Sequence, residues 1–359
     1  MRRHRLAQIA LVLCIALLIA LMPLLTGCNG EEEPTATPTP QPTAEPTATA
    51  EPTVEPTPEL TQFQMIQGAV AQYLMSPASN ISADDLFTLI TDGDESNDPY
   101  IISLRSAEHY AAGHIEGAVN MTFAEVFSAQ NLMDMNAAGK PIVVYCYTGQ
   151  TGSWTAALLG VLGFDVQNLL HGMSSWSDDP AVYGTRFDPD TDQMDFATET
   201  EANDPTETYD YPSPDWSPAM PTADATLFAA INANSYSGNI ISASDVFDLI
   251  TDGDAENDPF IISCRGAADY AKGHVPGAVN ISLGSLADNL DRIPSDGEVV
   301  VYCYTGQSAA QATALLRILG YDAKSMKFGM CAWSSDPEIN AGKCFNSANV
   351  AGYATVASE

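Results

Sequence analysis

Two cysteines of this chain stand in matching surroundings. Cys146 and Cys303 each follow the apolar run Val-Val-Tyr, and each is followed by Tyr-Thr-Gly-Gln. A short apolar run is typical of a buried strand, and the Ala- and Leu-rich segment after each loop predicts a helix. Backbone N–H groups at a helix N-terminus carry positive partial charge and stabilise a thiolate or terminal sulfur anion without a cationic side chain. The two loops therefore predict nucleophilic thiol chemistry.

The loop residues are the expected contacts for whatever the cysteines bind. Gly149 and Gly306 supply the positive φ or the close approach that so tight a loop needs. The candidate substrate-binding residues are Tyr147, Thr148, Gly149, Gln150 and Thr151 in the first loop, and Tyr304, Thr305, Gly306, Gln307 and Ser308 in the second. The alternative is a pair of inert core thiols or disulfide partners, since buried cysteines are common. Identical placement of both cysteines favours the functional interpretation.

The elements that position these loops are encoded twice. Residues 90–103 and 250–263 agree at 11 of 14 positions with an offset of 160, and residues 143–150 are identical to 300–307. Two copies indicate a tandem duplication and not a solenoid. Each copy alternates short apolar strands with helices, which predicts an α/β fold with a mainly parallel sheet covered by helices on both faces. Ligands bind beyond the carboxyl ends of the strands in such sheets.

A coarse assignment of the first copy shows this alternation. Ser82 is expected to cap a helix that carries Leu86, Leu89 and Ile90 at helical spacing. Further strands are expected at residues 100–104, 141–145 and 166–170, and further helices at 106–112 and 154–162.

The combined motifs resemble the rhodanese family of sulfurtransferases. They comprise the loops CYTGQT and CYTGQS, the upstream Arg-x-x-x-x-Tyr-x-x-Gly-His-x-x-Gly-Ala-x-Asn and the downstream Gly-Met-x-x-Trp. The resemblance implies two tandem rhodanese domains, whose loop cysteines Cys146 and Cys303 accept sulfane sulfur as a persulfide. Thiosulfate, a polysulfide or a persulfide would be the donor, and a thiol or cyanide the acceptor. The amides of residues 147–151 and 304–308 would cradle the outer sulfur, and neither a cofactor nor a metal is expected.

Two other functions are compatible with a cysteine loop on this fold. Related phosphatases need an arginine at the end of a loop one residue longer, to grip phosphate with its fork of donors. Gly152 and Ala309 stand at that position here, which argues against phosphatase chemistry. The other rival is a non-catalytic envelope binding or scaffold module that keeps the rhodanese fold, and the sequence leaves it open.

Arg105 and Arg265 are further candidates. Each is expected to hold the helix that follows it, through Glu108 or Asp269, and each is kept as a candidate substrate-binding residue. Neither loop contains a cation, and 46 acidic against 13 basic residues give a net charge of −33. This charge argues against nucleic-acid binding and predicts weak attraction for a dianion such as thiosulfate.

The N-terminus resembles a bacterial lipoprotein signal. Basic residues in positions 2–5 precede an apolar stretch that ends in Leu-Thr-Gly and Cys28. Cleavage before Cys28 and its lipidation would anchor the protein at the outer face of the cell membrane or in a periplasm, the membrane contact being made by the lipid alone. A plain transmembrane anchor is the alternative. The expected organisation is a signal peptide (1–27), a Pro/Thr/Glu-rich tether (28–62), domain 1 (63–183), an acidic and poorly packed linker (184–222), domain 2 (223–340) and a C-terminal tail (341–359).

Three cysteines of the second half remain, and their pairing stays open at this point. Cys331 and Cys344 would close a short loop, whereas Cys264 would instead resolve a persulfide on Cys303. The two Asp-Gly-Asp-x-x-Asn-Asp-Pro segments offer carboxylates, but Ser103 and Ser263 stand where a calcium-binding EF-hand needs Glu. Polar turns are the preferred interpretation.

Overall fold

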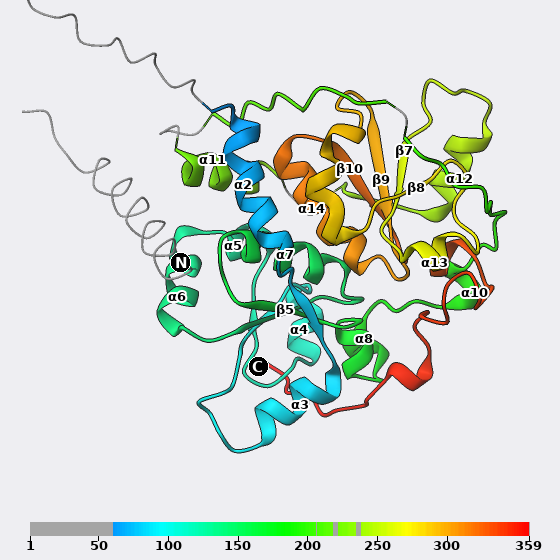
Figure 1. Ribbon diagram of the computed structural model, residues 1–359. Helices are drawn as coiled ribbons and strands as arrows, with labels where there is room; N and C mark the ends of the chain where they lie inside the picture. The colour runs from blue at the N-terminus through cyan, green and yellow to red at the C-terminus, as the bar shows by residue number, and fades with distance from the viewer. Residues whose placement is uncertain (1–59, 206, 218–221, 235–237, 359) are drawn as a thin grey trace, which may run out of the picture.

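The computed structural model describes residues 60–358 except 206, 218–221 and 235–237 (Figure 1). The predicted signal peptide, Cys28 and nearly all of the tether lie outside these residues. Among the described residues, no helix is long and apolar enough to cross a membrane.

Two five-stranded sheets form the framework, and every strand pair in them is parallel. The first has the order β1-β5-β4-β2-β3 and the second the order β6-β10-β9-β7-β8. The strands of the first sheet are β1 (Ser79–Ile81), β2 (Tyr100–Ser103), β3 (Val119–Asn120), β4 (Ile142–Tyr145) and β5 (Val166–Leu169). Those of the second are β6 (Ile240–Ile241), β7 (Phe260–Ser263), β8 (Val279–Asn280), β9 (Glu298–Tyr302) and β10 (Asp322–Met326). The predicted fold class is confirmed.

Helices cover both faces of each sheet. The first domain contains α2 (Gln62–Leu74), α3 (Ala83–Thr91), α4 (Ala107–Ala112), α5 (Phe123–Val126), α6 (Ala129–Ala138), α7 (Gln150–Val161), α8 (Met173–Trp176) and α9 (Pro180–Tyr183). Helix α10 (Pro189–Asp192) lies in the linker. The second domain contains α11 (Ala223–Ala233), α12 (Ala243–Thr251), α13 (Ala267–Tyr270), η1 (Leu283–Arg292), α14 (Gln307–Leu319) and α15 (Met330–Trp333). The short helix η2 (Ser347–Asn349) lies in the C-terminal tail.

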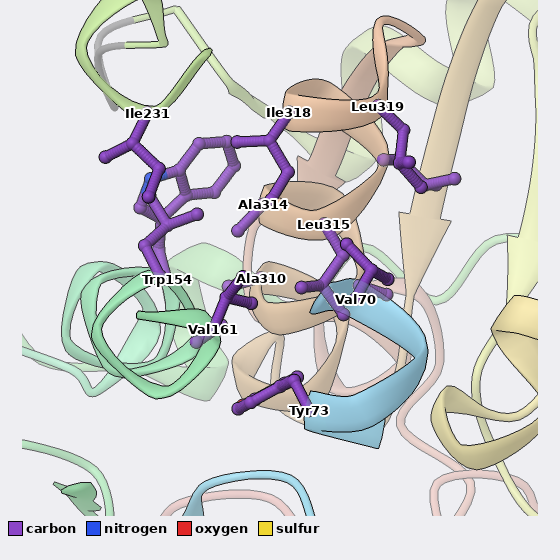
Figure 2. Packing of buried hydrophobic residues seen from close by; sticks show 14 of the residues in the cluster. Val70, Tyr73, Trp154, Val161, Ile231, Ala310, Ala314, Leu315, Ile318 and Leu319 are labelled. Atoms are coloured by element: carbon purple, nitrogen blue, oxygen red, sulfur yellow. The ribbon is translucent and has the colours of Figure 1, made fainter. Parts of the chain in front are cut away.

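The two domains share a single layer of helices between their sheets. Alternate residues of β4 point to opposite faces, so Val144 belongs to the cluster that continues into the second domain, whereas Val143 and Tyr145 face α3 and α8. Helices α7 and α14 pack against each other within the shared layer, and α2 packs on both of them (Figures 1 and 2). Figure 2 shows Trp154 of α7 and Val70 of α2 in the same cluster as Ile318 of α14. The duplicated halves therefore bury one continuous core.

Most predicted elements are found at their predicted places. Ser82 caps α3 through its side chain, which accepts a hydrogen bond from the N–H of Asp85, and α4 ends at Gly113 as expected. The predicted start of the helix after the first cysteine loop is wrong, because α7 begins at Gln150 and not at Trp154. Gly149, with φ of 85°, turns the chain directly into the helix.

The linker does not have the poor packing expected from its acidic composition. Its first part, residues 184–204, which we call the linker arm, lies on the second domain from Phe187 onward. Phe196 stacks on Phe247 with ring centroids 4.1 Å apart, and the N–H of Phe196 donates to the carbonyl of Trp333 at 2.8 Å. Aromatic stacking and main-chain pairing outweigh the acidic composition here.

The C-terminal tail makes the reciprocal contact with the first domain. Residues 341–358, which we call the C-terminal arm, leave the second domain and end beside α3 and α4 (Figure 1). Tyr353 stacks on Phe87 with centroids 3.9 Å apart, and its N–H donates to the carbonyl of Trp176. A disulfide between Cys331 and Cys344 fixes the start of this arm. Each domain is therefore covered by a segment that follows the other.

Candidate active site

Cys146 lies at the junction of strand, loop and helix that the sequence predicts. It follows the last residue of β4, its side chain is almost fully buried, and the N–H of Gly149 donates to its Sγ at 3.1 Å. Gly149 is also the N-cap of α7, so the first N–H groups of this helix lie next to the loop. The hydrogen bond found for this sulfur among the described residues thus comes from the main chain and not from a side chain.

A second loop, which follows β5, packs against the backbone of the cysteine loop. Gly172 has φ of 57°, and a Cβ placed on it would lie 2.4 Å from the carbonyl oxygen of Cys146. That oxygen accepts from the N–H of Met173 at 2.8 Å, and the carbonyl of Tyr147 accepts from the N–H of Ser174. The glycine of the downstream Gly-Met motif is thus required for the two backbones to approach closely.

The second domain repeats this architecture around Cys303. Gly306 has φ of 85°, and a Cβ on Gly329 would lie 2.5 Å from the carbonyl oxygen of Cys303. The same oxygen accepts from the N–H of Met330 at 2.8 Å. The structure therefore builds both predicted cysteine loops alike.

The loop tyrosines point away from the cysteines and fasten each loop to its own domain. The hydroxyl of Tyr147 lies 2.8 Å from Nδ1 of His109 and accepts from the N–H of Ser106. In the second domain the hydroxyl of Tyr304 donates to Asp269 at 2.6 Å. Burial and this carboxylate raise the pKa of Tyr304, so the phenol stays protonated and remains a donor.

The side chains of Gln150 and Gln307 contact the opposite domain. Both are buried; Oε1 of Gln150 accepts from the N–H of Phe328 at 3.2 Å. Oε1 of Gln307 accepts from the Nδ2 of Asn168 at 2.9 Å and, at 3.4 Å, from the N–H of His171. The two cysteine loops are therefore joined across the domain interface, which no sequence signal revealed. Thr151 and Ser308, half-buried, lie in the first turns of α7 and α14.

Thr148 and Thr305 bring the two loops to one small cavity. This cavity has a volume of about 20 Å³, enough for about one water molecule. Its walls come in equivalent pairs from the two halves: Thr148 and Thr305, His171 and Phe328, Ser174 and Cys331, Phe187 and Phe345. Burial lowers the pKa of His171 to about 4, so this imidazole is neutral at pH 7.

Arg105 and Arg265 do not have the carboxylate partners expected of them. Arg105 donates to the carbonyls of Val182 and Gly113, both at 2.6 Å, and to that of His109. Arg265 donates to the carbonyls of Ile339 and Gly273. Both guanidinium groups are buried. They tie the ends of helices α4 and α13 to Val182 and Ile339, which lie just before the two arms, because main-chain carbonyls at a helix end need donors. The expected pairing with Glu108 or Asp269 is wrong, and the role of the two arginines in substrate binding stays a prediction.

The structure also argues against the phosphatase alternative. A Cβ on Gly152 would lie 2.2 Å from Oδ1 of the buried Asn168, so an arginine at the sixth position after Cys146 would have to displace this side chain. Among the described residues, no group of three or more His, Cys, Asp or Glu side chains could hold a metal ion. In the acidic turns Asp92 accepts from the backbone of Asp94 and from the side chain of Asn97, as a polar turn requires.

Cys264 is the third free cysteine of the described chain, next to the second site. It follows β7, whose last residue Ser263 pairs with Tyr302 immediately before Cys303. Burial raises the pKa of the Cys264 thiol, with a further contribution from Cys303. Cys264 is therefore a protonated neighbour of Cys303 and no partner in the observed disulfide.

Comparison with known proteins agrees with this geometry. Residues 82–179 and 242–336, more than half of the chain, match the rhodanese-like domain family. The putative thiosulfate sulfurtransferase SseB of Mycobacterium tuberculosis is 39% identical over 90 residues, which are 21% of this chain and 32% of the relative. The sulfurtransferase of Allochromatium vinosum is 31% identical over 78 residues, 21% of this chain and 73% of the relative.

The match to SseB thus spans about a third of that relative's length. Among solved structures, a thiosulfate sulfurtransferase from Pseudomonas aeruginosa aligns over 76% of this chain and 68% of its own, with 14% identity and a TM-score of 0.26. Each matched segment contains one cysteine loop and every strand of its sheet except the first, β1 or β6, which lies just before it. The chain therefore belongs to the rhodanese-like domain family, which includes sulfurtransferases, and carries two such domains in tandem.

Proposed function

We propose that the protein is a rhodanese-type sulfurtransferase in which Cys146 and Cys303 each carry a persulfide. The observation that carries this proposal is the position of Cys146 Sγ beside the N-terminus of α7, where it accepts a hydrogen bond from the N–H of Gly149 at 3.1 Å. Main-chain donors in this arrangement favour an anionic sulfur. The matching loop around Cys303 supports the same role for the second site.

The reaction needs no oxidant, metal or cofactor. The thiolate attacks the outer sulfur of thiosulfate, a new S–S bond forms, and the S–S bond within thiosulfate breaks as sulfite leaves with the electron pair. Cyanide or a thiol then attacks the outer sulfur of the persulfide and releases the cysteine thiolate; cyanide becomes thiocyanate. A polysulfide or a small persulfide would donate in the same way.

Intact mass after exposure to thiosulfate or polysulfide tests the assignment. We expect a gain of about 32 Da for each loop cysteine, reversed by dithiothreitol. Cys146→Ser and Cys303→Ser should each remove one increment, whereas Cys264→Ser should retain both. No increment in the parent protein would favour the non-catalytic binding module, and retention in the double variant would assign the sulfur to another residue.

We further propose that the protein works outside the cytoplasm, anchored by lipid at Cys28. Support comes from the basic and apolar start of the chain with Leu-Thr-Gly-Cys at its end, and from the Cys331–Cys344 disulfide, since disulfides persist in oxidising compartments. Its partners would be small sulfur donors and acceptors, with the lipid as the membrane contact. In its bacterial host, Cys28→Ser should lose acyl-lipid labelling; a parent protein with Met1 intact in the cytosol would contradict the localisation.

A further inference from the structure

Cys264 and Cys303 directly follow two neighbouring strands, β7 and β9. The register of these strands pairs Ser263 with Tyr302, and the N–H of Cys264 continues the ladder by donating to the carbonyl of Tyr302 at 2.8 Å. In a parallel ladder this hydrogen bond makes Cys264 and Cys303 the next pair of neighbours. Paired strands lie about 4.8 Å apart, and the Cα atoms of a disulfide lie about 4.4–6.8 Å apart. The two cysteines therefore stand within bridging range of each other.

The two cysteine side chains point to the same face of the second sheet. Successive residues of a strand alternate between the faces. Ile262 and Val301 pack in the core that the two domains share, whereas Tyr302 packs in the cluster on the other side. Cys303 belongs to the shared core, and Cys264 packs against it. The two sulfurs thus lie on one side of the sheet, and the contribution of Cys303 to the raised pKa of the Cys264 thiol agrees with their proximity.

The first domain has the same backbone arrangement without the second thiol. Leu104 stands there in place of Cys264, and its N–H donates to the carbonyl of Tyr145 at 2.8 Å. Within the described part of the chain no other cysteine is free for this role, because Cys331 and Cys344 are bonded to each other. The duplicated sites therefore differ by a reactive group next to the loop cysteine.

We propose that the second site releases sulfide: the thiol of Cys264 attacks the inner sulfur of a persulfide on Cys303, and the two cysteines form a disulfide. The bond between Sγ of Cys303 and the outer sulfur breaks, and the outer sulfur leaves as HS⁻ with the electron pair and the proton of the thiol. The two cysteine sulfurs are oxidised while the outer sulfur is reduced, so the step needs no outside oxidant. Two molecules of a small thiol then reduce the disulfide by exchange and become a disulfide themselves. The inference rests on the sulfurtransferase function proposed above and adds a second activity to it.

This resolving step should be slow compared with loading of the cysteines by excess donor. Burial keeps the Cys264 thiol protonated, and a protonated thiol is a weak nucleophile. Both loop cysteines should therefore carry a persulfide directly after loading. Once the donor has been removed, the persulfide on Cys303 should be lost, whereas the persulfide on Cys146 should persist beside Leu104.

The test isolates the second site in the full chain with the Cys146→Ser variant, which is loaded with polysulfide and then freed of donor under argon. Intact mass should show a gain of about 32 Da that gives way to a loss of about 2 Da relative to the unloaded protein, with one equivalent of sulfide released. Adding Cys264→Ser should preserve the gain. Cys264→Leu, which installs the residue of the first domain, should do the same. Unloaded protein kept under argon is the control for disulfide formation by traces of oxygen.

The reciprocal variant moves the thiol to the first site. In the Cys303→Ser background the persulfide on Cys146 should persist, and Leu104→Cys should make it decay with release of sulfide. A persistent gain in the Leu104→Cys variant would overturn the argument from strand register.

A gain that persists in Cys146→Ser, or one that is lost equally fast after Cys264→Ser, would overturn the role of Cys264 and leave the enzyme a sulfurtransferase. If the parent protein shows neither the gain nor released sulfide, the proposed function is wrong, and this inference with it.

Discussion

His171 gives the protein a sensitivity to acid that can be worked out from the structure. The imidazole lies in the cavity between the two loops, its ring meets that of Phe345 edge-on at 5.1 Å, and burial lowers its pKa from 6.5 to about 4. Between about pH 6.5 and pH 4, His171 is therefore mostly neutral in the folded protein but mostly protonated in the unfolded chain. Because the unfolded state binds more protons there, the free energy of unfolding falls as the pH falls through this window.

The size of the effect follows from the shift. Each pKa unit corresponds to about 1.4 kcal/mol, so His171 should remove about 3 kcal/mol of stability between pH 7 and pH 4. The perturbation is His171→Phe, which installs the residue found at the equivalent position 328. Phe328 adopts φ of 59° and His171 φ of 61°, so phenylalanine is compatible with this backbone.

The assay is urea unfolding of the parent and the variant at pH 7, 5.5 and 4. Acidic residues contribute their own pH dependence to both proteins, so the quantity to compare is the difference between the two free energies at each pH. We expect this difference to shift by about 3 kcal/mol in favour of the variant from pH 7 to pH 4. A difference that is the same at all three values would refute the argument that His171 is buried and neutral.

Three further predictions concern the loops and the arms. Gly149→Ala should lower the free energy of unfolding, measured in urea, by about 1–3 kcal/mol more than Gly163→Ala does. Both glycines have positive φ, but only a Cβ at position 149 would meet Gln307, at 2.5 Å. Equal losses in the two variants would show that the side chain of Gln307 moves aside without cost. Cys344→Ser should cost about 3 kcal/mol, given the 13-residue separation of the disulfide, and make the variant's melting temperature insensitive to dithiothreitol. Tyr353→Ala should expose the C-terminal arm to limited proteolysis, since the stacking on Phe87 and the hydrogen bond to Asp84 are lost, and an unchanged digestion pattern would contradict this anchoring role.

Local sequence patterns predicted the fold and the cysteine loops because each depends on neighbours along the chain. The cap at Ser82, the strand that ends before Cys146 and the glycine that turns the chain into α7 are all short-range features. Because the sequence is duplicated, most of these local patterns occur twice. The start of α7 was missed because Thr151 and Gly152 are weak helix formers, and their helical state depends on the burial of this turn at the interface with the neighbouring domain.

Contacts between distant segments were beyond the reach of such patterns. The glutamines of the loops look like substrate contacts in the sequence, yet Gln150 and Gln307 cross to the opposite domain. The acidic composition of residues 184–204 indicated a loose linker, yet Phe187 and Phe196 within it pack against Phe328 and Phe247 of the second domain. A signal was present: phenylalanine recurs at residues 187 and 345 after each copy, at nearly the offset that relates the loops.

Because each arm packs against the opposite domain, the surroundings of the two cysteine loops are not independent of each other. In two independent domains, each cysteine loop would be surrounded by residues of its own half. Here Phe345, which follows the second domain, lies against His171 of the first, and Phe187, which follows the first, lies against Phe328 of the second. The paired walls of the cavity also differ between the halves, with a histidine facing a phenylalanine and a serine facing a disulfide-bonded cysteine. The cavity between the two cysteine loops is thus completed by residues of both halves and of both arms, so we expect a substitution of Phe187 or Phe345 to affect both loops.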